Sequence, residues 1–144
     1  MRKKFTKKQS GFTLIEVMVV VVILAILAAV IVPNILKRPE QARITAVKQD
    51  ILSIQNALSL YKLDNGFYPT TSQGLKALVA KPSSSPVPQN WASGGYLKKL
   101  PVDPWGNPYH YAHPGQHGNV DIWSDGAPSD SGVKKEIGNW QGNQ

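Results

Sequence analysis

The chain has 144 residues, no cysteine and a formal net charge of +7, which suits one modest domain plus an anchor and excludes disulfide bonds. Five of its 16 Lys and Arg residues lie within residues 2–8, which leaves 11 basic against 9 acidic residues in the rest. Because the body of the chain is nearly neutral, we expect no nucleic-acid partner.

An apolar run from Phe12 to Val32 follows the basic segment. A helix needs about 20 apolar residues to cross a hydrocarbon core, whereas the apolar part of a cleaved signal peptide has about 7–15 residues. The run therefore predicts a transmembrane helix over residues 12–32, with membrane lipid as a partner. The positive-inside rule places residues 1–11 in the cytoplasm and the remainder across the membrane.

Glu16 is an acidic residue near the start of this apolar run. A charge in a membrane span costs about 2.5–3.5 kcal/mol on insertion scales, so it needs a partner. The segment GFTLIE at residues 11–16, preceded by a basic leader, resembles the cleavage motif of type IV pilins and type II secretion pseudopilins. The resemblance implies that residues 1–11 are a leader peptide, that a prepilin peptidase cuts between Gly11 and Phe12, and that the new Phe12 amine is N-methylated.

Cleavage after Gly11 would create a cationic amine at Phe12, and this amine offers Glu16 a partner. In a stack of subunits, the Glu16 carboxylate of one copy could pair with the Phe12 amine of a neighbour, so that each charge makes burial of the other tolerable. The alternative is that Glu16 simply lies near a helix N-terminus, favoured by the macrodipole, and extends toward the membrane interface. The first interpretation predicts that Phe12 and Glu16 direct assembly.

Residues 33–65 are predicted to continue the long helix on the periplasmic side. Apolar residues recur there at intervals of three and four, which predicts a helix face packed on a domain. This apolar stripe consists of Ile44, Val47, Ile51, Ile54, Leu58 and Tyr61. The helix should end near Asn65 and Gly66. Pro33 and Pro39 favour either a kinked or unwound segment at residues 29–39, or one helix ending at Pro33 and another starting at Pro39.

Residues 66–144 are predicted to form a C-terminal globular domain. Thr71 or Ser72 is a candidate cap for a short helix. The side chains of this helix that face inward would be Leu75, Leu78 and Val79.

Two further features of the C-terminal domain follow from its turn residues. Residues 82–95 are rich in Pro, Ser and Gly and predict a loop, which Trp91 and Tyr96 would hold against the core. Residues 109–112 and 120–123 are strand candidates, separated by a hairpin-like turn at 114–119.

Four segments of the chain are distinctive: YKLDNGFYPTTSQGL at residues 61–75, LPVDPWGNPY at 100–109, PGQHGNVDIWS at 114–124 and IGNW at 137–140. Together with the N-terminal motif they closely resemble the major pseudopilins of type II secretion systems, over nearly the whole chain. The resemblance implies an α+β, pilin-like fold. In this fold a long N-terminal helix packs on a small C-terminal domain with a short antiparallel sheet.

The resemblance also implies a function and a location. Subunits would sit in the bacterial inner membrane and polymerise into a periplasmic pseudopilus that drives folded exoproteins across the outer membrane. Expected partners are further copies of the chain, the prepilin peptidase, minor pseudopilins and the inner-membrane assembly platform. Two alternatives stay open. One is a surface type IV pilin for adhesion, motility or DNA uptake, and the other is a monomeric membrane-anchored binding module.

The resemblance implies a calcium site in the loop at residues 124–136. Calcium takes about six to eight oxygen ligands, and Asp125, Asp130 and Ser131 could supply some of them. Lys134 and Lys135 stand where relatives tend to have acidic or small polar residues, and a protonated lysine offers no lone pair. The alternative is a loop closed by hydrogen bonds, with Lys134 or Lys135 paired to an aspartate in place of the ion.

The remaining motifs do not predict catalysis, and we expect a protein that is not an enzyme. The serines lack the surroundings of a nucleophile, and we find no glycine-rich phosphate loop. His110, His113 and His117 raise the question of zinc, but a predicted strand and a Pro-Gly turn separate them, so a shared zinc site is not expected. The four tryptophans are expected to anchor the core and its turns.

Overall fold

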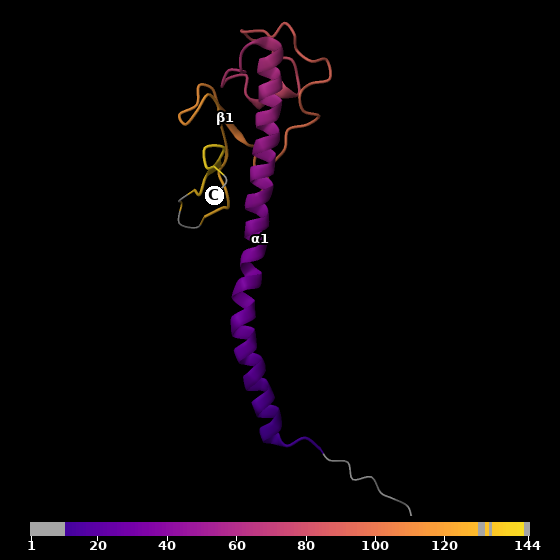
Figure 1. Cartoon of the computed structure of the whole chain (residues 1–144), viewed down its shortest axis with the longest axis vertical. Coiled ribbons are helices and arrows are strands. Elements are labelled where there is room, and N and C mark those ends of the chain that lie inside the picture. Colours follow the sequence, from indigo (N-terminus) through magenta and orange to yellow (C-terminus); the bar gives the residue numbers. More distant parts are fainter. Residues whose placement is uncertain (1–10, 130–131, 133, 143–144) are drawn as a thin grey trace, which may run out of the picture. The chain divides into compact units, whose positions relative to one another are not determined.

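The computed structural model describes residues 11–129, 132 and 134–142, and of residues 30–38 it describes the backbone alone. The chain divides into two compact units, Met1–Glu40 and Gln41–Gln144. In chain order the elements are α1 (Leu14–Asn65), the 3-10 helix η1 (Leu75–Leu78), β1 (His110–Ala112), β2 (Asp121–Ser124) and β3 (Ile137–Gly138) (Figure 1). The predicted α+β class is confirmed.

α1 is one uninterrupted helix of 52 residues from Leu14 to Asn65. Neither Pro33 nor Pro39 ends it, so the predicted division into two helices is wrong, and so is the predicted unwinding at residues 29–39. A kink in this segment stays a prediction. A proline inside a helix removes one hydrogen bond and costs about 3 kcal/mol. Once a helix exists, each further residue adds a hydrogen bond, so the turns on both sides of a proline can continue it.

The first part of α1 is exposed among the residues that the structure describes. Every residue from Gly11 to Ala29 is exposed within the chain. Judged over the residues that the structure describes, no helix is long and apolar enough to cross a membrane. Residues 30–32 of the span predicted at 12–32 have side chains outside the described set.

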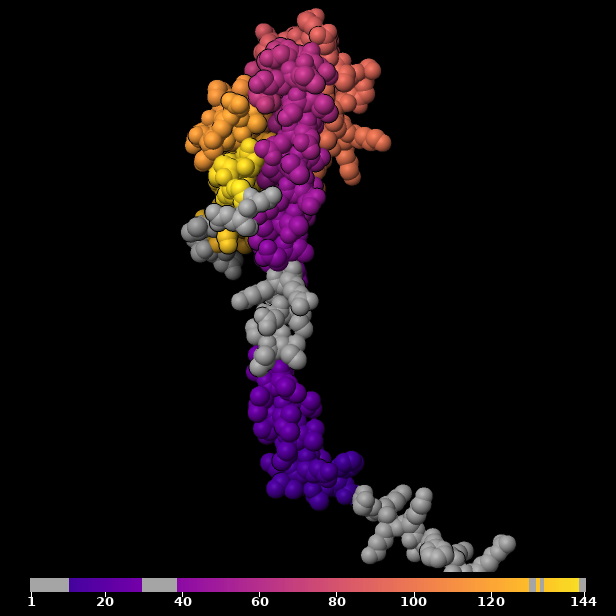
Figure 2. Space-filling view, in the orientation of Figure 1, coloured from indigo at the N-terminus to yellow at the C-terminus, as the bar shows by residue number. Residues whose placement is uncertain are grey.

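The apolar stripe of α1 forms the core of the C-terminal unit. Ile54, Leu58 and Tyr61 each have a relative exposure of 0%, and the stripe packs in one cluster with Leu78 of η1 and Ile122 of β2. The predicted packing of this helix face on the domain is therefore confirmed. In Figure 2 the face of α1 toward the viewer, coloured purple to magenta, is uncovered, and the orange and yellow C-terminal segments lie beside it.

α1 ends where the sequence predicts, because Gly66 adopts a left-handed conformation with φ of +83°. The predicted loop that follows η1 is also held as expected. The Trp91 indole N–H donates to the Ala77 carbonyl at 2.8 Å, and the Tyr96 hydroxyl donates to Asp64 at 2.9 Å. These two bonds connect the loop to η1 and to the end of α1.

η1 differs from the prediction in its type and in its cap. It is a 3-10 helix preceded by Gly74, and no side chain caps it. Leu75 and Leu78 are buried as predicted, and Val79 is half-buried. The Thr71 hydroxyl instead accepts from the backbone N–H of His113 at 2.9 Å and donates to its carbonyl at 3.0 Å. The proposed Thr71 or Ser72 cap is therefore wrong, because Thr71 joins this turn to the end of β1.

The sheet is antiparallel, with strand order β1-β2-β3. Tyr111 pairs with Ile122, and both side chains are buried against the core. The two predicted strands are confirmed to within one residue, and β1 lies beside α1 (Figure 1). β3 was not predicted, because two residues carry no detectable alternation. At Gly138 of β3 a Cβ would overlap the Trp140 indole, so a larger residue there would have to displace that ring.

Candidate functional site

The predicted cleavage point lies just outside α1 on exposed backbone. Gly11 and Phe12 precede the helix, Phe12 is 84% exposed, and a Cβ built on Gly11 meets no atom within 4 Å. A peptide bond outside a helix suits the active-site cleft of a peptidase. The structure thus leaves the Gly11–Phe12 bond accessible within the chain.

Thr13 caps the start of α1. Its hydroxyl oxygen accepts a hydrogen bond from the backbone N–H of Glu16 at 3.3 Å. This is the arrangement of an N-cap residue and the third helical residue, with an acidic side chain in the first turn. The geometry agrees with the simpler interpretation of Glu16, that the positive end of the helix dipole favours its carboxylate.

The Glu16 side chain also faces an apolar surface. Phe12, Glu16, Val17, Val20 and Val21 line one shallow hollow on the N-terminal part of α1. Within the described part of the chain, Glu16 forms no ion pair. Its carboxylate is therefore open to a cation from another molecule, and apolar side chains surround the place where such a cation would bind.

The loop that was predicted to bind calcium is closed by a lysine. The Lys134 ammonium donates to Asp125 Oδ2 at 2.7 Å, and His110 Nε2 lies 3.3 Å from the same oxygen. The hydrogen bond from Lys134 is the main cause that lowers the pKa of Asp125, and this pair raises the pKa of Lys134. Gly126 has φ of +77°, and a Cβ there would overlap the Lys135 carbonyl. The two ends of the loop therefore lie in contact.

The Lys134 ammonium thus bonds the carboxylate that calcium would need at Asp125, and the calcium site stays a prediction. Asp130 and Ser131, the other two predicted ligands, lie outside the described residues. In the part of the chain that is described, no group of three or more His, Asp or Glu side chains could hold a metal ion. Of the two interpretations of this loop, the Lys134 pair is the one that the described atoms display.

The three histidines have separate partners. His110 lies against Asp125, His113 Nδ1 contacts the Asn119 carbonyl at 2.8 Å, and His117 Nδ1 contacts Asp121 at 2.9 Å. The strand and the turn keep these side chains apart, as the spacing predicts.

Two buried carboxylates shape the turns around the sheet, and the sequence interpretation missed both. Asp103 accepts from the backbone N–H groups of Trp105 and Asn107 at 3.0 and 2.8 Å and from the Ser124 hydroxyl at 2.7 Å. Asp121 accepts from the backbone N–H of Gln116 at 2.8 Å. The signal available for Asp103 was its position before Pro, Trp and Gly, where an aspartate commonly bonds the backbone two residues on.

Asp121 is only 4% exposed, yet its charged form is favoured. Burial alone would raise the pKa of Asp121, but hydrogen bonds from the His117 ring and from the amides of Gln116 and His117 bring it below its ordinary value. The His117 ring stacks on the Trp140 indole with centroids 4.0 Å apart. This network joins the turn after β1 to the segment after β3.

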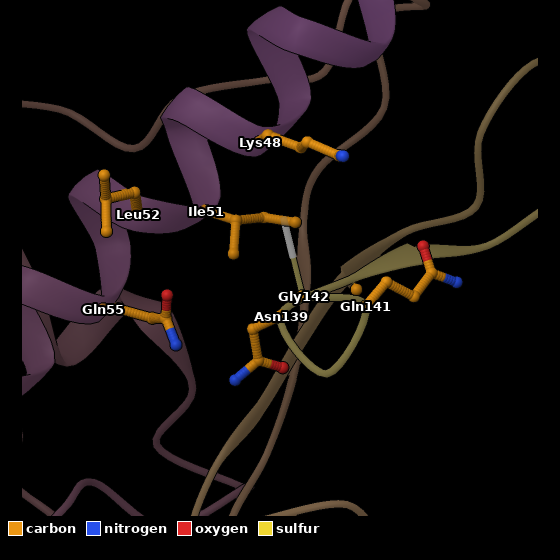
Figure 3. A pocket seen from close by; sticks show the side chains of 8 residues that line it. Lys48, Ile51, Leu52, Gln55, Asn139, Gln141 and Gly142 are labelled. Carbon is orange, nitrogen blue, oxygen red and sulfur yellow. The ribbon is translucent and has the colours of Figure 1, made fainter. Parts of the chain in front are cut away.

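A further hollow lies between α1 and residues 138–142 (Figure 3). Lys48, Ile51, Leu52 and Gln55 line it from α1, and Gly138, Asn139, Gln141 and Gly142 line it from the other side. Lys48 is the one ionisable side chain among these lining residues. General acid–base catalysis needs a suitably placed acid or base with a tuned pKa, and this hollow has no acid and base side by side.

Comparison with known proteins finds matches to both the N-terminal motif and the C-terminal domain. The family described as type II secretion system (T2SS), protein G, matches residues 34–140, and the prokaryotic N-terminal methylation motif matches residues 6–32. Type II secretion system core protein G of Pseudomonas aeruginosa is 58% identical over 137 residues, covering 93% of this chain and 96% of the relative. The same protein of Vibrio cholerae is 53% identical and covers 95% of each chain.

The fold agrees as well. The crystal structure of the major pseudopilin from the type 2 secretion system of enterohaemorrhagic Escherichia coli superposes with a TM-score of 0.68 and 42% identity. It covers 75% of this chain and 91% of that chain. Sequence and structure together show that this chain belongs to the type II secretion system protein G family of major pseudopilins.

Proposed function

We propose that this chain is a structural subunit that polymerises into the periplasmic pseudopilus of a type II secretion system and so drives folded exoproteins across the outer membrane. The family membership and the pseudopilin fold support this function. The observation that carries it is the N-terminal helix, whose apolar residues from Leu14 to Ala29 are exposed. Such a surface needs lipid or other subunits to cover it. The chain acts in this proposal as a building unit and not as an enzyme.

Assembly begins with removal of the leader, residues 1–11. The prepilin peptidase hydrolyses the exposed Gly11–Phe12 bond, and the new Phe12 amine is N-methylated and stays cationic. In the filament this amine pairs with the Glu16 carboxylate of a neighbouring copy, within the apolar hollow that Phe12, Val17, Val20 and Val21 line. Removing one member of such a buried pair costs about 3–5 kcal/mol, because the other charge is left without a partner.

Before assembly, the subunit is anchored in the bacterial inner membrane by residues 12–32. The basic leader favours the cytoplasmic side for residues 1–11, and the unit Gln41–Gln144 then lies in the periplasm. The inner-membrane assembly platform and minor pseudopilins are the partners during assembly. This placement rests on the charge pattern and on the methylation motif at residues 6–32.

Complementation tests the proposal. The chain is expressed in a γ-proteobacterial strain that lacks its own type II secretion protein G, and secreted hydrolase activity is measured in the medium. We expect secretion to be restored and filaments to form when the chain is overproduced. Surface appendages and motility without secretion would instead support a surface pilin. A chain that stays monomeric in the membrane, as judged by cross-linking in intact cells, would support an anchored binding module.

A further inference from the structure

The face of the sheet that is turned away from the core carries aromatic rings. Tyr111 and Ile122 lie in the core with α1, so His110 and Trp123, which follow or precede them on their strands, lie on the opposite face. The His110 and Trp123 rings stack there with centroids 5.2 Å apart. The Trp140 ring lies 6.2 Å from Trp123, centroid to centroid. His110, Trp123 and Trp140 thus form an aromatic face on the sheet.

Small residues leave room for a hollow in this aromatic face. Gly138 pairs with Trp123 across the sheet, and a Cβ on Gly138 would overlap the Trp140 indole, so this ring lies directly on β3. Trp123 and Trp140 line the hollow at an interplanar angle of 56°, with Ala112 beside them. Its volume of about 220 Å³ is below the roughly 300–1,000 Å³ of sites for drug-sized ligands. This indole hollow therefore suits a single side chain better than a cofactor.

The charged groups of the indole hollow are acidic. The rest of its lining consists of Gln116, His117, Asp121 and Glu136. None of the described residues that line it is a lysine or an arginine. Asp121 is buried, and the amides of Gln116 and His117 stabilise its charge. Glu136 is exposed, and the nearby Lys134 ammonium bonds Asp125 at 2.7 Å instead.

A cation fits these groups better than a sugar does. Both oxygens of Asp121 already accept hydrogen bonds from the chain, so they offer little to the hydroxyl groups of a sugar. A cation needs only the negative charge, which those bonds leave in place. Tryptophan is the side chain that attracts cations best, by about 0.5–2 kcal/mol. Arginine is favoured over lysine, because its planar guanidinium stacks on aromatic rings.

We propose that the indole hollow binds an arginine side chain on the surface of a protein that the pseudopilus exports. The inference rests on the proposed function. The aromatic face lies on the side of the sheet opposite α1, so a filament built around its α1 helices would leave this face open to the periplasm. A folded protein carries most of its arginine side chains on its surface, so one of them can enter the hollow without unfolding.

Two peptides test the binding chemistry on the full chain in detergent. Acetyl-Gly-Arg-Gly-amide carries the guanidinium group, and the same peptide with citrulline has nearly the same shape without the charge. We expect the arginine peptide to shift the indole NMR signals of Trp123 and Trp140 in a saturable way and to leave those of Trp91 and Trp105 in place. The citrulline peptide should bind about tenfold more weakly.

A sugar probe distinguishes the alternative ligand. Equal binding of the two peptides, or a saturable shift with chitotriose and none with the arginine peptide, would overturn the inference. Neither result would touch the proposed function, because filament formation does not enter this measurement.

A charge reversal tests the source of the arginine in cells. Glu136→Lys places an ammonium group at the indole hollow and should lower the affinity for the arginine peptide by about tenfold or more. Its filament yield should equal that of the unmodified chain, while secretion of the exported hydrolase falls severalfold. The matched control Gln89→Lys adds a lysine on an exposed loop and should keep both properties.

The two proposals fail in different ways in this experiment. Secretion by Glu136→Lys at the level of Gln89→Lys would overturn the inference, since exported proteins would then not use the hollow. Failure of the unmodified chain to form filaments or to restore secretion would instead contradict the proposed function itself.

Discussion

The two halves of α1 are exposed in opposite ways. From Leu14 to Ala29 every residue is exposed within the chain, including Leu24 at 59% and Ile26 at 61%. From Gln41 to Asn65 the apolar stripe is buried by the rest of the unit, and the opposite face is uncharged but open. Apart from Glu16, the first half is apolar on all sides, whereas the second half is apolar only on the side that its own domain covers.

Because of this difference, the stability of the domain and the assembly of the chain should depend on different halves of α1. Substitutions in the second half of α1 should change the stability of the domain, because its side chains pack in the core. Substitutions in the first half should change assembly and leave the domain folded.

Leu58→Ala should destabilise the domain by about 2–5 kcal/mol, because it leaves a cavity in the centre of the core, where Leu58 has no exposed surface. Leu60→Ala, two residues away on the same helix and 52% exposed, should cost about 0.5 kcal/mol or less. Urea unfolding of the solubilised chain, followed by tryptophan fluorescence, measures both, since all four tryptophans belong to the C-terminal unit. Equal losses for the two variants would contradict the observed packing.

Asp121 should make the domain sensitive to acid. Folding lowers the pKa of Asp121, so the unfolded chain binds its proton more readily than the folded chain. The stability that this carboxylate contributes is present above its unfolded pKa of about 3.9 and is lost as the pH falls through the lower folded value. Asp121→Asn should therefore be less stable near neutral pH and should lose less stability between about pH 5 and pH 2.

The measurement for Asp121 is the urea midpoint as a function of pH. Glu136→Gln, which removes an exposed carboxylate nearby, serves as the control and should leave the acid dependence of the unmodified chain in place. An acid dependence in Asp121→Asn as steep as that of the unmodified chain would show that other carboxyl groups cause it.

The Lys134–Asp125 pair should have the smallest effect on stability, because Lys134 is 65% exposed and water screens the pair. We expect addition or chelation of calcium to leave the melting temperature of the unmodified chain unchanged, since Lys134 occupies the Asp125 carboxylate. Lys134→Ser should lower the melting temperature slightly, and the neighbouring Lys135→Ser should serve as its control. Heat on titration with calcium, with a rise in melting temperature, would instead support the predicted site at Asp125, Asp130 and Ser131.

The parts of the fold that the sequence predicts are those with periodic patterns. The apolar stripe repeats over several turns of α1, and the two longer strands flank a clear run of turn residues. β3 and the cap of η1 were missed, because they depend on contacts between segments far apart in the chain, such as Thr71 with His113. The prediction of a break at Pro33 and Pro39 was wrong, because the local propensity of proline does not report how far the helix continues on either side.

The candidate site divides in the same way. The residues Gly11 to Glu16 form a contiguous motif, so the sequence alone singles them out. Asp103 and Asp121 accept hydrogen bonds from backbone amides that only the folded turns bring within reach. The spacing of residues in the sequence does not predict such contacts. The sequence predicts that Lys134 or Lys135 pairs with an aspartate in place of a metal ion. That Lys134 pairs with Asp125 depends on the close approach of Gly126 to Lys135, which only the folded loop shows.

Filament assembly by Glu16→Gln tests the central claim most directly. The substitution keeps the shape of the side chain and removes the charge that would pair with the Phe12 amine of a neighbour. The account predicts that the variant is cleaved, stays in the membrane fraction and retains the melting temperature of the unmodified domain, while filaments are absent from sheared cell preparations. Filaments in the same yield as from the unmodified chain would contradict the account.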